Sequence, residues 1–101
     1  MREVLRKLIK APSVAGFEGE VRTIIANEFK RLGLKVKIDV IGNVIGVKAD
    51  GRKYRLMLAA HMDQIGLMIT YIDEKGYAHF SAKGYDARVL YGQHVVFYGE
   101  K

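Results

Sequence analysis

The sequence contains no cysteine, and its only proline is Pro12. The missing thiols exclude disulfides, thiolate catalysis and zinc-thiolate sites, and they agree with a reducing cytoplasm, where we expect the protein to act. No stretch approaches the roughly 18 uninterrupted apolar residues of a membrane span. The N-terminus is charged and mixed, unlike a secretory signal. We therefore expect a globular chain with no membrane association.

The sequence also lacks a dense patch of like charge. The net charge is +6, from 17 basic and 11 acidic residues, but these are interleaved along the 101 residues. The one dense group, Arg52-Lys53-Arg55, follows a predicted turn at Asp50-Gly51. Tyrosines such as Tyr71 and Tyr77 are explained by strand preference as well as by base stacking. We predict no nucleic-acid partner. No carboxylate pair suggests glycan hydrolysis. Abundant Lys and Arg with few Asn and Gln is a faint signal of a thermophilic source.

Apolar periodicity predicts two helices near the N-terminus. Residues 2–10 carry apolar side chains at helical spacing, and Pro12 ends the run. Residues 17–32 present one apolar stripe, with acids in the first turn and bases in the last. Gly33 follows as a predicted C-terminal cap.

Strand patterns take over after the second helix. They are predicted at residues 36–40, 44–48, 56–60, 67–72, 77–81 and 95–98, with turns at Gly42-Asn43 and at residues 73–76. The fold class predicted is α/β, with two N-terminal helices on one mixed sheet. Residues 56–60 are apolar on both faces and require cover on both sides. Residues 89–101 look like the start of another strand system, so the sequence resembles the front of a longer protein, with an uncovered edge that favours association.

A histidine and a carboxylate follow the most apolar of these strands. Along a strand His61 and Asp63 would share a face and touch. Imidazole is the commonest metal ligand, and a carboxylate on its other nitrogen fixes the tautomer and the ring orientation. The carboxyl end of a strand is also where open sheets place their chemistry. The pair predicts a metal ligand with its orienting partner, although an ordinary surface pair has the same spacing.

Several motifs in order resemble one enzyme family. They are Leu-Ile-Lys-Ala-Pro-Ser-Val-Ala-Gly-Phe-Glu at 8–18, Asp-Val-Ile-Gly-Asn at 39–43, Ala-His-Met-Asp-Gln-Ile-Gly at 60–66 and Arg-Val-Leu-Tyr-Gly-Gln at 88–93. Together they are similar to the amino-terminal part of the tetrahedral aminopeptidase and glutamyl aminopeptidase family of dinuclear metallopeptidases, some members of which were labelled endoglucanases. The resemblance implies a zinc-exopeptidase-like catalytic domain over residues 1–84 and the start of an inserted β dimerisation domain over residues 85–101.

The resemblance also implies roles for single residues. His61 matches the histidine that binds one of two metal ions, zinc or cobalt, and Asp63 matches the aspartate that orients it. A metal-activated water would attack the peptide carbonyl, with a glutamate from later in the family's sequence as general base. Gln64 occupies a position where members often have an acid. His79 and His94 do not match family ligands and are expected to be surface or pairing residues.

The implied activity is removal of amino-terminal residues from peptides by a homo-oligomer. This chain carries one of the five or six ligands that a dinuclear site needs, so we expect it to bind no metal tightly and to hydrolyse no peptide alone. An alternative is a non-catalytic interaction or regulatory subunit that assembles with full-length relatives. A relic gene product is a further alternative.

Overall fold

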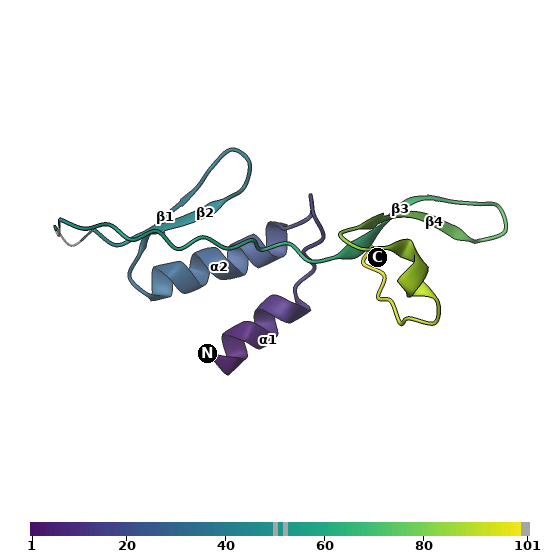
Figure 1. The fold of residues 1–101 in the computed structure, drawn as a ribbon, viewed down its shortest axis with the longest axis horizontal. Coiled ribbons are helices and arrows are strands. Elements are labelled where there is room, and N and C mark those ends of the chain that lie inside the picture. The colour runs from purple at the N-terminus through teal and green to yellow at the C-terminus, as the bar shows by residue number, and fades with distance from the viewer. Residues whose placement is uncertain (50, 52, 100–101) are drawn as a thin grey trace.

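The computed structural model describes residues 1–49, 51 and 53–99. Asp50 and Arg52, which belong to the predicted turn and basic group, lie outside the described residues. The order of elements is α1 (Arg2–Lys10), α2 (Gly19–Arg31), β1 (Lys35–Ile38), β2 (Val44–Val47), β3 (Gly66–Ile72), β4 (Ala78–Lys83) and a short 3-10 helix, η1 (Ala87–Leu90). Figure 1 shows both helices with the β1–β2 hairpin at one end and the β3–β4 hairpin with η1 at the other.

Both predicted helices form. The end of α2 confirms the glycine cap, because Gly33 has φ +75°, a conformation that favours glycine. Its N–H donates to the carbonyl of Lys30 at 2.9 Å, and the N–H of Leu34 donates to Phe29 at 3.0 Å. These two hydrogen bonds satisfy carbonyls that the helix end leaves without partners.

The β1–β2 hairpin packs against α2. The two strands are antiparallel, from the pair Lys35–Val47 to the pair Ile38–Val44. Gly46 allows the close approach to the helix, since a Cβ there would lie 2.6 Å from Cδ2 of Phe29. The hairpin is thereby fixed to the second helix by a contact that only glycine permits.

The β3–β4 hairpin is also antiparallel, and its register shifts between Ile69 and Tyr71. Its predicted turn is built on Asp73, whose Oδ1 accepts hydrogen bonds from the backbone N–H groups of Lys75 and Tyr77, each at 2.9 Å. These backbone donors, the Tyr77 N–H first, lower the pKa of Asp73 below its ordinary value.

Three expectations about the sheet are wrong. The described strands form two separate two-stranded antiparallel sheets instead of one mixed sheet. Residues 56–60 form no strand and are exposed, because nothing in the described chain supplies a neighbouring strand or a covering layer. Residues 95–98 also lack regular structure. Both stretches have strand-like side chains, but a strand needs partners from elsewhere in the fold.

The buried residues lie in the helical half of the molecule. Ala11, Ser13, Val21, Ala26 and Gly42 are buried, with Ser13 only 2 % exposed. They belong to α2, to the loop that leaves α1 and to the β1–β2 turn. Among the described residues, no helix is long and apolar enough to cross a membrane.

Candidate functional site

The site predicted from the sequence lies on the segment that joins residues 56–60 to β3. One side of this segment faces a solvent-open hollow of about 190 Å³. Its walls come from the start of α2, with Glu18 and Arg22, from the β1–β2 turn at residues 41–43, and from residues 60–63. Three stretches that are distant in the sequence therefore meet around His61 and Asp63.

His61 and Asp63 contact each other as predicted. The Nδ1 atom of His61 lies 3.0 Å from Oδ1 of Asp63 and 3.1 Å from the backbone carbonyl oxygen of the same residue. Both neighbours are hydrogen-bond acceptors, so Nδ1 must carry the proton. In this tautomer the lone pair lies on Nε2. Because 84 % of the His61 side chain is exposed, this lone pair is free to bind an ion.

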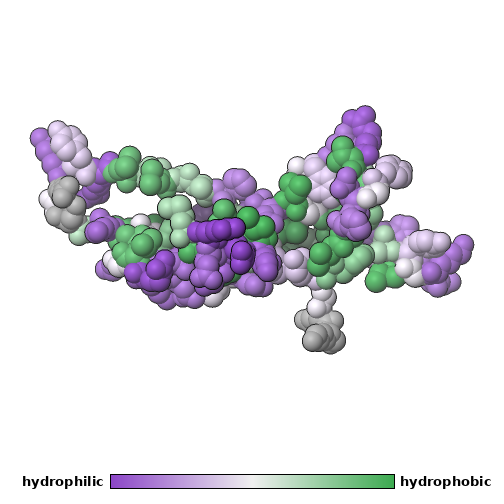
Figure 2. Space-filling view, turned by 90° about the horizontal axis from the view of Figure 1, so that it is seen from below, coloured by the Kyte–Doolittle hydropathy of each residue, from purple (hydrophilic) through white to green (hydrophobic). Residues whose placement is uncertain are grey.

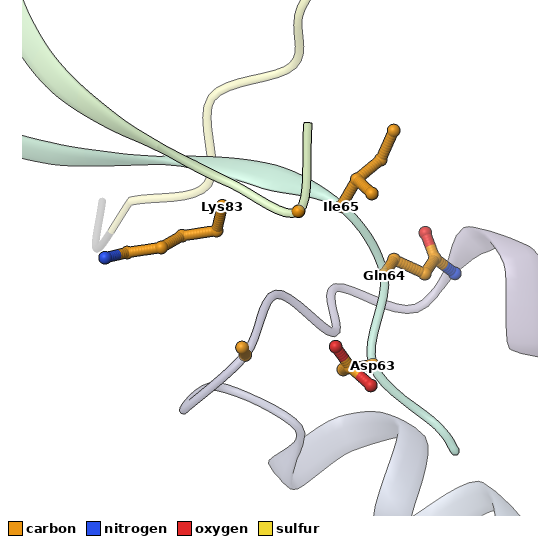
Figure 3. Close-up of a pocket in the computed structure, with 6 residues that line it drawn as sticks. Asp63, Gln64, Ile65 and Lys83 are labelled. Atoms are coloured by element: carbon orange, nitrogen blue, oxygen red, sulfur yellow. The ribbon is translucent and has the colours of Figure 1, made fainter. Parts of the chain in front are cut away.

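The loop after α1 supports the segment that follows this pair. The backbone N–H of Gln64 donates to the carbonyl of Ser13 at 2.8 Å, and Val14 and Gln64 form a parallel β-bridge. The side-chain amide of Gln64 donates to the carbonyl of Leu8 at 3.3 Å, close to the end of α1. Figure 3 shows Asp63, Gln64 and Ile65 in sequence along this segment, beside a small pocket that Lys83 also lines.

Gly66 makes the contact with this loop possible. A Cβ on Gly66 would lie 2.2 Å from Cγ2 of Val14, far inside an ordinary van der Waals contact. The first residue of β3 therefore lies directly against the side chain of Val14. Together with the Gln64 hydrogen bonds, this contact fixes the chain three residues beyond Asp63.

The opposite wall of the hollow is charged. Arg22 extends over Gly42, where a Cβ would lie 2.4 Å from Nη2 of the guanidinium. Its Nη2 is 3.8 Å from Oε2 of Glu18, whose Oε1 accepts a 2.7 Å hydrogen bond from the N–H of Gly16. The Nε of Arg22 is buried without a hydrogen-bond partner among the described residues. The wall thus brings one guanidinium and one carboxylate toward the histidine pair.

The other two histidines lie outside this hollow. His79 is in β4, where its ring stacks on Tyr71 with centroids 4.0 Å apart and its Nε2 is 3.4 Å from Oδ2 of Asp73. His94 is exposed in the last described stretch. Both therefore occupy surface or pairing positions, as expected from the sequence.

A complete metal site is not found within residues 1–49, 51 and 53–99. No group of three or more His, Asp, Glu or Cys side chains in this part of the chain is arranged to hold an ion. Of the predicted site, the structure thus brings together a single histidine and its carboxylate partner. Sequence patterns did not reveal the contacts of Gln64 with Leu8 and of Gly66 with Val14, because neither residue type signals such a distant neighbour.

Comparison with known proteins identifies the family. Residues 42–101 match the family model described as M42 glutamyl aminopeptidase. The chain is 38% identical over 101 residues to the lysyl aminopeptidase of Pyrococcus furiosus, covering 98% of this chain and 29% of that protein. It is 44% identical over 98 residues to a candidate aminopeptidase of Acetivibrio thermocellus, covering 96% and 29%. The glutamyl aminopeptidase of Lactococcus lactis is 29% identical over 97 residues, covering 93% and 27%.

The chain therefore spans less than a third of the length of these curated relatives. No solved structure matches it significantly. The family model covers more than half of the chain, and the relatives align along nearly all of it. The chain belongs to the M42 glutamyl aminopeptidase family.

Proposed function

We propose that this chain contributes the first metal-binding histidine and its orienting aspartate to a metal-dependent aminopeptidase. The observation that supports the proposal best is the contact of Nδ1 of His61 with both oxygen acceptors of Asp63. This contact selects the tautomer whose lone pair is on Nε2, the nitrogen that does not contact Asp63. Peptides are the substrate class, as the aminopeptidase names of the relatives suggest.

His61 suits a metal ion as one ligand of several. Imidazole nitrogen binds zinc and cobalt well, and an Asp on the second nitrogen raises the basicity of the ring and holds its plane. In a dinuclear site the ions would supply Lewis acidity and a reactive water at neutral pH. His61 would hold one ion through Nε2, and Asp63 would keep the proton on Nδ1.

Contacts with the loop between α1 and α2 support the segment that carries His61 and Asp63. The backbone of Gln64 is bonded to Ser13, and Gly66 lies against Val14, so the chain beyond Asp63 has two fixed points. A ligand held in place before the metal arrives loses less conformational entropy on binding. We assign this support to the loop between α1 and α2.

The proposal includes inactivity of the 101-residue chain alone. One imidazole provides one bond to an ion, whereas catalytic zinc sites use three protein ligands. The remaining ligands and the general base would come from a polypeptide corresponding to the part of the relatives that this chain does not span. Zinc or cobalt as the metal, a homo-oligomeric assembly and a cytoplasmic location are finer parts of the same proposal, as is the start of a dimerisation domain at residue 85.

A chimera tests these roles. The stretch of the Pyrococcus furiosus lysyl aminopeptidase that aligns with this chain is replaced by residues 1–101, and hydrolysis of a lysyl anilide is measured with added zinc or cobalt. The chimera should be active, and His61→Ala should abolish the activity. Asp63→Asn should lower it by about 10- to 100-fold, the usual effect of removing an orienting partner. His94→Ala is the matched control, an exposed histidine outside the hollow, and should leave the rate unchanged.

Two results would contradict the proposal. One is an active chimera whose rate survives His61→Ala. The other is metal-dependent hydrolysis by the 101-residue chain alone, which would show that the chain holds a complete site.

A further inference from the structure

Arg22 lines the hollow beside His61 and Asp63, and its surroundings are unusual for a charged residue of this chain. Most charged side chains of the two helices are exposed, and Figure 2 shows hydrophilic side chains grouped over this part of the molecule. The side chain of Arg22 is only 30 % exposed, and its Nε is buried. Arg31, on the same helix, is 67 % exposed and forms an ion pair with Glu28 at 2.7 Å. Each arginine follows a glutamate by three or four residues, so the difference lies in what else the guanidinium contacts.

The guanidinium of Arg22 packs on the backbone of Gly42, in the β1–β2 turn. Gly42 is buried and has φ +96°, a conformation that favours glycine. A Cβ on Gly42 would lie 2.7 Å from Cζ of Arg22 and 3.0 Å from Nε, so the flat group occupies the space that a side chain would take. A guanidinium suits such a contact, because it is planar and less strongly hydrated than an ammonium group. The contact joins the start of α2 to the β1–β2 turn.

The turn that Arg22 contacts is closed by its own hydrogen bonds. Both carboxylate oxygens of Asp39 accept hydrogen bonds from Asn43, one from its backbone N–H at 2.9 Å and one from its side-chain amide at 2.8 Å. The N–H of Gly42 donates to the carbonyl of Asp39 at 3.1 Å. All of these bonds join residues of the turn, so they set its shape without fixing it to α2. The contact with Arg22 provides that attachment.

Two glycine contacts thus hold the β1–β2 hairpin along α2. Gly46 lies against Phe29 towards the end of the helix, and Gly42 lies against Arg22 near its start. The second contact is the one at the site, because Gly42 and Arg22 line the same hollow as His61. Groups around a reacting centre must be placed closely, since a displacement of about 1 Å can lower a rate by about 100-fold. The position of the turn therefore matters for any reaction in the hollow.

We propose that Arg22 is a positioning residue of the candidate site, which holds the β1–β2 turn in the place that the reaction requires. It acts through the turn and is no metal ligand, because a guanidinium has no acceptor atom. Glu18, whose Oε2 lies 3.8 Å from Nη2, balances its charge. The inference rests on the proposed metal role of His61.

The chimera with the lysyl aminopeptidase of Pyrococcus furiosus tests this role in a complete enzyme. Arg22→Met keeps the length of the stem and removes the flat charged group. It should lower kcat for the lysyl anilide by about 10- to 100-fold and change KM by less than about threefold, because the wall of the hollow moves. Zinc affinity, measured by competition with a chelator, should stay within about threefold, since the contact of His61 with Asp63 is unchanged. Arg31→Met is the matched control and should leave all three quantities unchanged.

Two further substitutions separate the shape of the side chain from its charge. Arg22→Lys keeps the charge and the pairing with Glu18, but its compact, strongly hydrated ammonium does not cover Gly42, so kcat should fall as in Arg22→Met. Gly42→Ala should reproduce the loss, because its methyl group displaces the guanidinium. Gly76→Ala is the matched control for the backbone, since Gly76 has φ +85° and no atom within 4 Å of an added Cβ. It should leave kcat unchanged.

Amide exchange of the 101-residue chain gives a readout that needs neither metal nor activity. The N–H of Gly42, which is bonded to Asp39, should exchange at least about fivefold faster in Arg22→Met, because the turn is no longer held on the helix. The N–H of Leu34, which is bonded to Phe29 at the other end of α2, should exchange as in the parent. The pair of amides separates loosening of the turn from unfolding of the helix.

Three results would overturn the inference. The first is an active chimera in which Arg22→Met keeps the parent kcat. The second is full activity of Arg22→Lys, which would assign the effect to the charge. The third is equal acceleration of exchange at Gly42 and Leu34, which would assign Arg22 to the general stability of α2. An inactive chimera contradicts the proposed function instead, and the exchange experiment then decides alone whether Arg22 holds the turn.

Discussion

Substitution of Gly66 by alanine tests how the candidate site is supported. A Cβ at this position would lie 2.2 Å from Cγ2 of Val14, and an ordinary contact begins at 3.4 Å, so one of the two segments must move by about 1.2 Å. Gly66 begins β3, which is paired with β4. The loop that carries Val14 includes the buried Ser13. A shift of either segment would therefore strain the pairing of β3 or the packing around Ser13.

The cost follows from overpacking. Inserting a methyl group into a close contact destabilises by about 1–3 kcal/mol. The hydrogen bond from the N–H of Gln64 to Ser13, two residues from the insertion, is the nearest reporter of this strain. Amide exchange of Gln64 should therefore accelerate by about 5- to 150-fold in Gly66→Ala.

Two companion variants make the steric explanation testable. Val14→Ala in the Gly66→Ala background removes the methyl groups that clash and should restore most of the protection of the Gln64 amide. Gly19→Ala adds the same methyl group where no atom lies within 4 Å and should leave that amide unaffected. The reasoning is refuted if Gly66→Ala exchanges as slowly as the parent, or if the double variant is no slower than Gly66→Ala.

The β1–β2 hairpin, whose turn forms part of the wall of the hollow, gives two further predictions. The Asn43 side-chain amide, followed by backbone donors, lowers the pKa of Asp39 below 3.8. The ionised carboxylate therefore stabilises the β1–β2 turn fully above pH 3.8. This stabilisation is lost as the pH falls through the lower pKa of the folded state. Amide exchange of Asn43 should accelerate in this acidic range, and Asp39→Ala should remove the dependence. Gly46→Ala places a Cβ 2.6 Å from Cδ2 of Phe29 and should lower stability by about 1–3 kcal/mol, measured by denaturant unfolding, whereas Gly99→Ala meets no neighbour and should have no effect.

The elements that could be predicted from the sequence are those determined by nearby residues. Helices α1 and α2 lie within two residues of their predicted limits, because an apolar stripe and a glycine cap are local signals. The same is true of the two hairpins. Their turns depend on Asp39 and Asp73, each of which accepts hydrogen bonds from backbone N–H groups two and four residues later. Each of these elements contains the partners that it needs.

Residues 56–60 show where this reasoning fails. Their composition predicts a buried strand, since the side chains on both faces are apolar, and this prediction is wrong for the described chain. Their secondary structure is absent because a central strand depends on neighbours from elsewhere in the fold, and the described chain offers none. The same reason explains why two sheets replace the mixed sheet that was predicted. A sequence pattern reports what a segment requires, and only the whole fold determines whether the requirement is met.

The contacts of the candidate site differ in the same way, between partners that are close in the sequence and partners that are distant. The contact between His61 and Asp63 spans two residues, so it could be predicted and it forms even though the strand before it does not. The hydrogen bond from Gln64 to Leu8 spans 56 residues, and no sequence pattern predicted it. Gln64 donates through a side-chain N–H, and a glutamate at this position would be an acceptor facing the Leu8 carbonyl, with no proton to share at neutral pH. The amide of Gln64 is thus the side chain that can donate to Leu8, and this hydrogen bond keeps the segment that carries His61 attached to α1 although residues 56–60 before it are uncovered.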